Sequence, residues 1–188
     1  MTVTGLVLAA GGSKRLGEPK QLLAYRDTTL LGHVVETARQ SGFDQIVVAL
    51  GGAADEIQEQ VDLGGCDLTL NEQFGAGCST SIRSALSAVR GDLMVLLLGD
   101  QPGVTPEHVK TLLAGRGDAP IAVTRYEDGV GHPFAFSRAT FDDLRALRGD
   151  KAVWKLIEQR GEEVAQVEVR GTVPVDVDTW DDYRAVLA

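Results

Sequence analysis

The sequence predicts an α/β protein: a single-domain, Rossmann-like, three-layer αβα sandwich around a mostly parallel sheet. Short apolar runs alternate with amphipathic stretches, as in βαβ units. The apolar runs contain little polar alternation, which is typical of strands that helices cover on both faces. The chain has 188 residues, enough to bury one substantial core, and we expect residues 1–188 to form one domain.

The predicted elements follow in the order that this fold requires. Residues 3–9 and the segment "QIVVAL" predict two strands, separated by a helix that begins after a cap at Thr28 and stops at Gly42. Residues 67–70 and the very hydrophobic "LMVLLLGD" predict two more strands, and "APIAVTR" and "HPFAFS" are further apolar segments. The other predicted helices cover 54–61, 79–89, a stretch beginning at Pro106, 141–147, 151–160 and the C-terminus.

Composition and charge exclude several classes of protein. The formal net charge of −9 does not attract nucleic acid or anionic membranes, so we expect neither as a partner. No apolar run approaches the roughly 20 residues that span a bilayer. Cys66 and Cys78 form no CxxC pair and no secretory leader precedes "MTVTGLVLAA", so we expect reduced thiols and a cytoplasmic location.

The first strand runs directly into "AGGSKRLGEPK", residues 10–20, which we call the glycine-rich loop. Successive backbone N–H groups without bulky side chains can bind phosphate oxygens, and Arg15 and Lys20, which we expect to be exposed, add positive charge. The loop is neither a Walker A motif, because Glu18 follows Gly17, nor a GxGxxG fingerprint. A solvated turn remains the alternative, since Gly, Ser and Pro also favour turns for local reasons.

Ligands of such sheets bind at the carboxyl ends of the strands, and three more of these ends carry polar chemistry. Asp100 after "LLLG" suits Mg²⁺ or caps the next helix, a role open to Thr105 as well. Asp176 and Asp178 are two residues apart and point the same way in an extended segment, as metal ligands or as part of a helix cap. "NEQFGAGCSTSIRSAL" offers an anion or base-edge site or a plain capped helix.

These motifs together resemble one family. "LVLAAGGSKRLGEPKQLL" is similar to the opening motif of the MobA-like nucleotidyltransferases, and "LAAG" with "GDQP" resembles their molybdenum cofactor cytidylyltransferase (MocA-like) branch. "GHPFAFS" resembles the family's GxP motif, and "VDVDTWDDY" its closing DxDTPEDY motif. Trp180 stands where the family has Pro, and "RGDKAVWKLI" is only partly similar to GDKGAR, which weakens the assignment of the second substrate.

The resemblance implies a nucleotide-diphospho-sugar transferase-like fold and a set of site residues. Nucleotide binding would involve Ala9, Ala10, Gly11, Gly12, Ser13, Arg15, Lys20, Asn71, Ser79, Ser81, Gly99 and Asp100. Catalysis would fall to Arg15, Lys20 and Asp100. Mg²⁺ would be held by Asp100 with Asp178 or Asp176. The acceptor would lie against Gly131, His132 and Pro133.

The implied reaction moves CMP from CTP to a phosphorylated acceptor, molybdopterin or the molybdenum cofactor, and releases pyrophosphate. Positioning and charge neutralisation supply most of the rate in such a transfer, and a phosphate acceptor needs no general base. A molybdoenzyme or a chaperone would be the protein partner. The alternatives are GTP use, sugar-phosphate nucleotidyl transfer, an NAD(P)H-dependent reductase of the same family, and a nucleotide-binding chaperone without catalysis.

Overall fold

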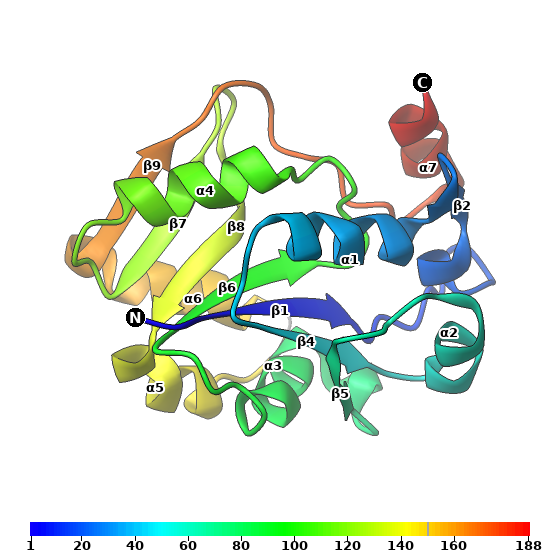
Figure 1. The fold of residues 1–188 in the computed structure, drawn as a ribbon, viewed down its shortest axis with the longest axis horizontal. Coiled ribbons are helices and arrows are strands. Elements are labelled where there is room, and N and C mark those ends of the chain that lie inside the picture. The colour runs from blue at the N-terminus through cyan, green and yellow to red at the C-terminus, as the bar shows by residue number, and fades with distance from the viewer. Residues whose placement is uncertain (150) are drawn as a thin grey trace.

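The computed structural model describes residues 1–149 and 151–188, and its centre is a seven-stranded sheet (Figure 1). The strand order is β5-β4-β1-β6-β8-β7-β9. The strands are β1 (Val3–Ala9), β4 (Gln45–Leu50), β5 (Asp67–Leu70), β6 (Leu93–Leu98), β7 (Ile121–Arg125), β8 (Val130–Ser137) and β9 (Val164–Glu168). A small hairpin, β2 (Ala24–Tyr25) with β3 (Thr28–Thr29), stands apart from the sheet.

The sheet is mostly parallel, as predicted, with one exception that matters for the site. Strands β5, β4, β1 and β6 are parallel to one another, and β7 is parallel to β9. Strand β8 runs antiparallel to both β6 and β7. The start of β8 therefore lies at the same edge of the sheet as the ends of β1 and β6.

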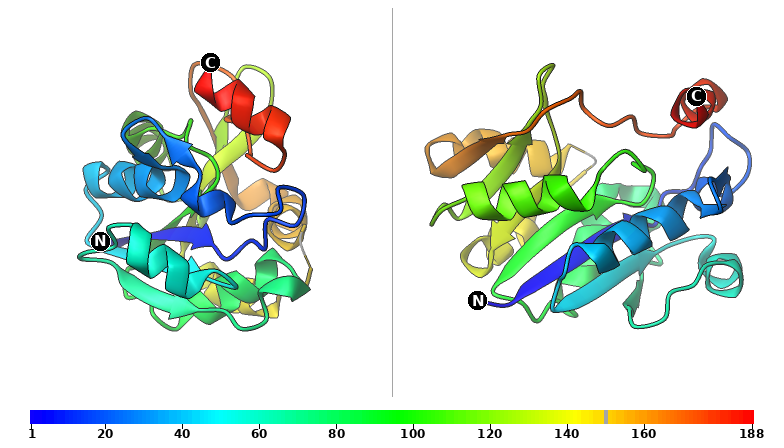
Figure 2. Two further views of the ribbon diagram at one scale, coloured as in Figure 1. Left: turned by 90° about the vertical axis from the view of Figure 1, so that its right-hand side faces the viewer. Right: turned by 45° about the horizontal axis from the view of Figure 1, so that its top comes forward.

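Helices cover both faces of the sheet, which confirms the three-layer sandwich (Figures 1 and 2). One face packs against α1 (Leu30–Gln40), α2 (Ala54–Gln60) and α4 (Pro106–Gly115). The other face packs against α3 (Cys78–Leu86), α5 (Phe141–Ala146) and α6 (Ala152–Gln159). No helix of the part that the structure describes is both long and apolar enough to cross a membrane.

The C-terminal segment crosses the molecule instead of adding to the sheet. After β9 the chain runs back over the carboxyl ends of the strands to α7 (Trp180–Leu187), which lies beside the β2–β3 hairpin (Figure 2). Val177 is fully buried there in a small core with Leu16 and Tyr25, and Tyr183 donates a hydrogen bond to the carbonyl oxygen of Ala24 at 2.6 Å. This small core ties the C-terminal segment to the glycine-rich loop.

Local capping explains most element boundaries. Thr29, not the predicted Thr28, caps α1, and its side chain accepts a hydrogen bond from Gly32 N. Thr105 caps α4 and Thr179 caps α7, so neither Asp100 nor Asp178 is needed for that role. The sequence did not predict β9, because "VAQVE" is short, half polar and lies at the sheet edge.

Candidate active site

A cavity of about 880 Å³ opens at the edge of the sheet where β1 and β6 end and β8 begins. This volume is within the range of small-molecule sites. Twelve of the residues singled out from the sequence line the cavity: Ala10, Gly11, Gly12, Ser13, Arg15, Lys20, Ser81, Asp100, Gly131, His132, Asp176 and Asp178. Ala9, Asn71, Ser79, Gly99 and Pro133 do not line it.

The glycine-rich loop keeps its shape through hydrogen bonds from one side chain that the sequence did not single out. Gln21 is buried, and its Nε2 donates to the carbonyl oxygens of Ala9 at 2.8 Å and Gly11 at 3.0 Å. Ser13, at a φ of 47°, accepts a hydrogen bond on its Oγ from the backbone N–H of Lys20 at 2.9 Å. The loop is therefore a preformed turn, held by hydrogen bonds near both ends, and Gly11 and Gly12 face the cavity.

Two glycines at the end of β4 allow the loop to approach the sheet. A Cβ on Gly51 would lie 2.5 Å from the carbonyl oxygen of Ala10, and one on Gly52 would lie 2.6 Å from the ring of Phe74. The ring of Phe74 also lies next to Gly12. The glycine pair in "ALGG" was visible in the sequence, but the close approach that requires it is a tertiary feature.

Five charged residues meet beside the loop, and we call them the charged cluster: Arg15, Lys20, Asp100, Asp176 and Asp178. The Nζ of Lys20 donates hydrogen bonds to Asp100 Oδ2 and, at 2.7 Å, to Asp178 Oδ1. Arg15 donates to the other oxygen of Asp178 at 2.7 Å. The side chain of Lys20 is only 10% exposed, whereas that of Arg15 is 67% exposed. Lys20 is therefore an ion-paired interior cation and not the exposed cation that the sequence suggested.

The electrostatics of the cluster are unequal. Burial alone would lower the pKa of Lys20, but the carboxylates of Asp100 and Asp178 outweigh it and raise that pKa. Burial likewise acts to raise the pKa of Asp178, and the hydrogen bonds and charges of Lys20 and Arg15 more than reverse this. The pKa of Asp176 is raised to about 6, first by desolvation at the cavity wall and then by repulsion from Asp100 and Asp178. The cluster therefore carries negative charge that its own cations do not fully balance.

This donor set fits a hydrated divalent cation better than a cage made of protein ligands alone. Carboxylate oxygens suit Mg²⁺ and Mn²⁺, and Mg²⁺ commonly takes one or two carboxylates and completes its shell with water and phosphate oxygens. Among residues 1–149 and 151–188, no group of three His, Cys, Asp or Glu side chains is arranged to hold a metal. Asp100 with Asp178 or Asp176 could hold the ion once a phosphate supplies further oxygens.

The start of α3 forms a second wall, and the buried Asn71 fixes it from behind. The side-chain amide of Asn71 donates to Thr80 Oγ1 at 2.8 Å and Ser81 Oγ at 2.9 Å. Ser81 reaches the cavity, whereas Asn71 and Ser79 lie behind its wall. Asn71 therefore holds the start of α3 in place and does not itself face the cavity.

The third wall is apolar and aromatic. His132 at the start of β8 is buried, and this burial lowers its pKa to about 3. Its ring lies 4.1 Å from that of Phe134, and Trp154 of α6 contacts both rings nearly edge-on. We call His132, Phe134 and Trp154 the aromatic cluster. Trp154 lines the cavity and is 42% exposed, and sequence reasoning noted only that its segment departs from the family pattern.

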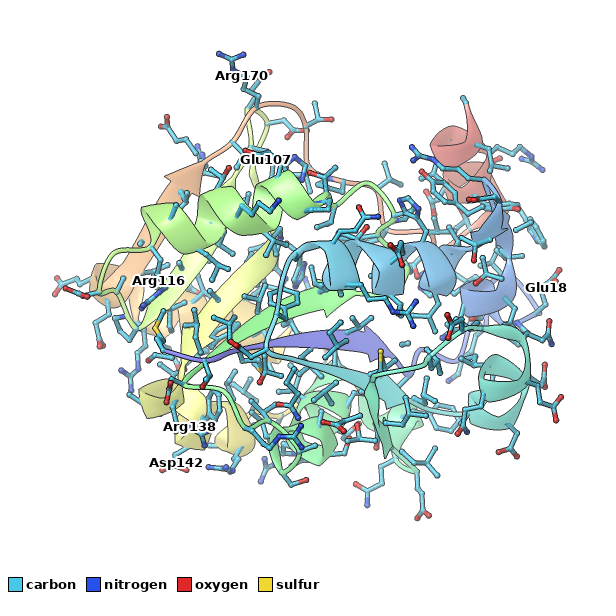
Figure 3. The ribbon with its side chains drawn as sticks, viewed as in Figure 1. Glu18, Glu107, Arg116, Arg138, Asp142 and Arg170 are labelled. Carbon is cyan, nitrogen blue, oxygen red and sulfur yellow. The ribbon has the colours of Figure 1, made fainter. Side chains whose placement is uncertain are left out.

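Charged residues elsewhere serve other purposes. Glu18 marks the glycine-rich loop at one end of the molecule, whereas Arg116 and Arg138 lie toward the opposite end of the sheet (Figure 3). Arg138 donates to the carbonyl oxygens of Arg90 and Gly91, and Arg116 to that of Ala119. Arg116 and Arg138 therefore stabilise turns far from the cavity. The positive charge at the cavity comes from the few cations that line it, in a chain whose net charge is −9.

Comparison with known proteins agrees with this geometry. Residues 5–164 match the MobA-like NTP transferase domain family. The solved structure of Rv0371c from Mycobacterium tuberculosis H37Rv is 50% identical, with a TM-score of 0.94, over 100% of this chain and 97% of that one. A second structure of Rv0371c, in complex with manganese, is 48% identical with a TM-score of 0.90, over 100% and 98% of the two chains.

The curated relatives are more distant and differ in what they are named for. The nicotine blue oxidoreductase of Paenarthrobacter nicotinovorans is 33% identical over 66% of this chain and 62% of its own length. The bifunctional protein GlmU of Alkaliphilus metalliredigens is 26% identical over 90% of this chain. The chain spans only 36% of that GlmU. Two solved structures below 25% identity share the nucleotide-diphospho-sugar transferase-like fold. They are a CMP:2-keto-3-deoxy-manno-octonic acid synthetase, with a TM-score of 0.80, and the bifunctional IspDF from Campylobacter jejuni, with a TM-score of 0.79.

Proposed function

Because the chain belongs to the MobA-like NTP transferase domain family, we propose that it is a magnesium-dependent nucleotidyltransferase that moves CMP from CTP to a phosphorylated acceptor of the molybdopterin or molybdenum cofactor type. The observation that carries this proposal is the charged cluster beside the glycine-rich loop, in particular Lys20 between Asp100 and Asp178. We assign residues 1–188 to one MobA-like domain, since the C-terminal segment supplies Asp176 and Asp178 to the same cavity.

The proposed reaction is an in-line displacement. An oxygen of the acceptor's terminal phosphate attacks the α-phosphorus of CTP, and the bond between that phosphorus and the bridging oxygen to the β-phosphate breaks. Pyrophosphate leaves with the bond's electron pair. The backbone N–H groups of the glycine-rich loop with Ser13 would hold the triphosphate, and Arg15 and Lys20 would offset its charge.

No residue is needed as a general base, because a phosphate oxygen is already nucleophilic. The buried His132 agrees with this: its pKa of about 3 leaves it neutral at physiological pH, so it adds no charge to the acceptor wall. Gly131 and His132 would shape the space for the acceptor, and Pro133 would hold them from behind. Gly99 and Ala9 would act similarly behind the nucleotide.

A divalent cation at Asp100 would stabilise the negative charge that develops on the phosphates. The manganese complex of Rv0371c supports a divalent ion in a relative of this chain. We propose Mg²⁺ as the ion, held by Asp100 together with Asp178 or Asp176. We propose CTP over GTP because "LAAG" and "GDQP" resemble the cytidylyltransferase branch of the family. A pocket shaped for a pyrimidine base would reject the larger purine by size.

We further propose a cytoplasmic enzyme that passes its product to a molybdoenzyme or a dedicated chaperone, without contact to nucleic acid or membrane. The net charge of −9 supports the last two exclusions. GTP-dependent or sugar-phosphate nucleotidyl transfer remains an alternative within the same chemistry.

A reductase is the second candidate, and one observation favours it: the 33% identity to a nicotine blue oxidoreductase. Against it, the charged cluster offers two cations that suit a triphosphate and three carboxylates that suit a metal ion. The chain also contains no GxGxxG dinucleotide motif.

One assay separates the candidates. The purified protein is incubated with Mg²⁺, each NTP in turn and molybdopterin, and pyrophosphate release is followed; NADPH oxidation is followed in parallel with nicotine blue as acceptor. We expect pyrophosphate with CTP well above that with GTP, and no NADPH oxidation. Pyrophosphate with GTP alone would overturn the base preference. NADPH oxidation without pyrophosphate release would overturn the proposed function, and binding of CTP without either reaction would indicate a chaperone.

A further inference from the structure

Trp154 is an exposed aromatic residue for which packing gives no reason. In α6, Ala152, Val153 and Leu156 are buried and hold the helix on the sheet, whereas Trp154 is 42% exposed and lies outside the apolar core. Its indole is nonetheless fixed in place, because its ring lies 5.1 Å from Phe134 and 6.4 Å from His132 in nearly perpendicular contacts. A fixed, partly exposed indole on a cavity wall is a surface suited to a planar ligand.

The chemistry of this wall is unlike that of the glycine-rich loop. Among the described residues, the parts of β8 and of the start of α6 that line the cavity are Val130, Gly131, the neutral His132, Lys151, Val153 and Trp154, and none of them is a carboxylate. Lys151, at the start of the same helix, also lines the cavity and is exposed. An aromatic surface beside a single cation fits a flat heteroaromatic ring that carries an anionic substituent.

Two planar groups would enter this cavity under the proposed function: the base of the nucleotide and the ring system of the acceptor. The nucleotide's phosphates belong at the glycine-rich loop, and the wall facing Gly12 is the segment with Phe74, whose ring lies 3.6 Å from a Cβ on Gly12. That wall is therefore adjacent to the nucleotide. The wall with Trp154 belongs to α6 and β8, on the other side of the end of β6.

We infer that Trp154 is the stacking surface for the heteroaromatic ring of the acceptor, with Lys151 facing its anionic substituent. The inference rests on the proposed function for the identity of the reaction and of the acceptor, and it adds the side chains that would hold the acceptor's ring and its anionic substituent. It also gives "RGDKAVWKLI", the segment that departs from the family pattern, a role in selecting the acceptor.

The chain offers a clean optical test because it contains two tryptophans, and Trp180 lies on α7 outside the cavity lining. The W180F variant leaves Trp154 as the sole tryptophan, and the matched W154F variant leaves Trp180. Each is titrated with pterin-6-carboxylate while tryptophan emission is recorded. We expect deeper saturable quenching in W180F, whose remaining indole would contact the bound ligand, than in W154F, whose remaining indole lies outside the cavity lining. Equal behaviour of the two variants would overturn the inference.

Calorimetry of the same probe measures what the indole contributes. We expect Trp154→Ala to weaken pterin-6-carboxylate binding at least about tenfold, Trp154→Phe to weaken it less, and both to leave CTP affinity within about twofold. Because Trp154 is partly exposed, both variants should keep the melting temperature, which is measured alongside. Saturable quenching of Trp154 by CTP together with loss of CTP affinity would assign the indole to the nucleotide and refute the inference.

The outcome is independent of the proposed reaction. If pterin-6-carboxylate binds at Trp154 but no NTP yields pyrophosphate with molybdopterin, the proposed function fails and the acceptor class stands. If pyrophosphate is released at the same rate by the wild-type protein and by Trp154→Ala at subsaturating molybdopterin, the proposed function stands and the role of Trp154 fails.

Discussion

The charged cluster and the aromatic cluster lie on one cavity but owe their geometry to different forces. The charged cluster is held by hydrogen bonds and ion pairs between segments far apart in the chain, such as Lys20 with Asp178. The aromatic cluster is held by packing of α6 on β8 and contains no ion pair of its own in the described chain. Substitutions in the charged cluster should therefore act through charge, and substitutions in the aromatic cluster through shape and solvation.

The largest effect is expected at Asp100, where the charged cluster would bind the metal. We expect Asp100→Asn to lower pyrophosphate release at least about a hundredfold, because losing a metal ligand removes several kcal/mol of charge stabilisation. The fold should persist, since the backbone contact from Val177 N to the carbonyl oxygen of Asp100 does not depend on the side chain. Turnover equal to wild type at saturating Mg²⁺ would refute the metal role.

Replacing Lys20 should lower both the stability and the activity of the protein. Lys20→Met leaves the partly buried carboxylates of Asp100 and Asp178 without their ammonium, so we expect about 1–3 kcal/mol less stability, below the value for a fully buried pair because Asp178 is 40% exposed. We expect kcat/KM for the NTP to fall about a hundredfold.

Lys14→Ala is the matched control for Lys20→Met, since Lys14 is an exposed cation of the same loop that also lines the cavity. We expect it to leave stability within about 0.5 kcal/mol and to reduce kcat/KM far less. Urea unfolding and steady-state kinetics on both variants make the comparison. Equal losses in the two variants would show that only the total charge of the loop matters.

Gly51→Ala tests the close approach behind the glycine-rich loop. The new Cβ would lie 2.5 Å from the carbonyl oxygen of Ala10, so the loop or β4 must shift, at a cost of about 2 kcal/mol, and the affinity for NTP should fall. Gly161→Ala is the control, because a Cβ there meets no atom within 4 Å. Thermal melts measure the stability of both variants, and NTP titrations measure their affinity. Equal stability and equal affinity in the two variants would contradict the close approach at Gly51.

The smallest effect is expected at His132, in the aromatic cluster, and it depends on pH. Burial lowers the folded-state pKa to about 3, below the usual 6.5, so the unfolded chain takes up a proton first as the pH falls. His132 therefore adds no penalty above pH 6.5 and costs stability as the pH drops below it, about 1.4 kcal/mol at pH 5.5. Urea unfolding measures the free energy of unfolding at pH 7.5 and at pH 5.5, and the loss between the two should be smaller for His132→Gln than for wild type. An equal loss in both proteins would refute the role of the buried His132 in this pH dependence.

The sequence by itself determined the layered α/β fold, the helices, the glycine-rich loop and the strand-end carboxylates. These features are local: apolar runs, helical spacing and turn residues each act within a few positions along the chain. The sequence motifs also predicted the family, and the match of residues 5–164 to the MobA-like NTP transferase domain confirms it.

Only the tertiary structure decided which of those residues meet. The antiparallel direction of β8 places His132 beside the ends of β1 and β6, and no local pattern encodes strand direction. The crossing of the C-terminal segment brings Asp178 to Lys20, 158 positions away, and turns an apparently exposed cation into an interior ion pair. Burial and pairing depend on packing between distant segments, so the pKa values and the exposed indole of Trp154 followed only from the folded chain.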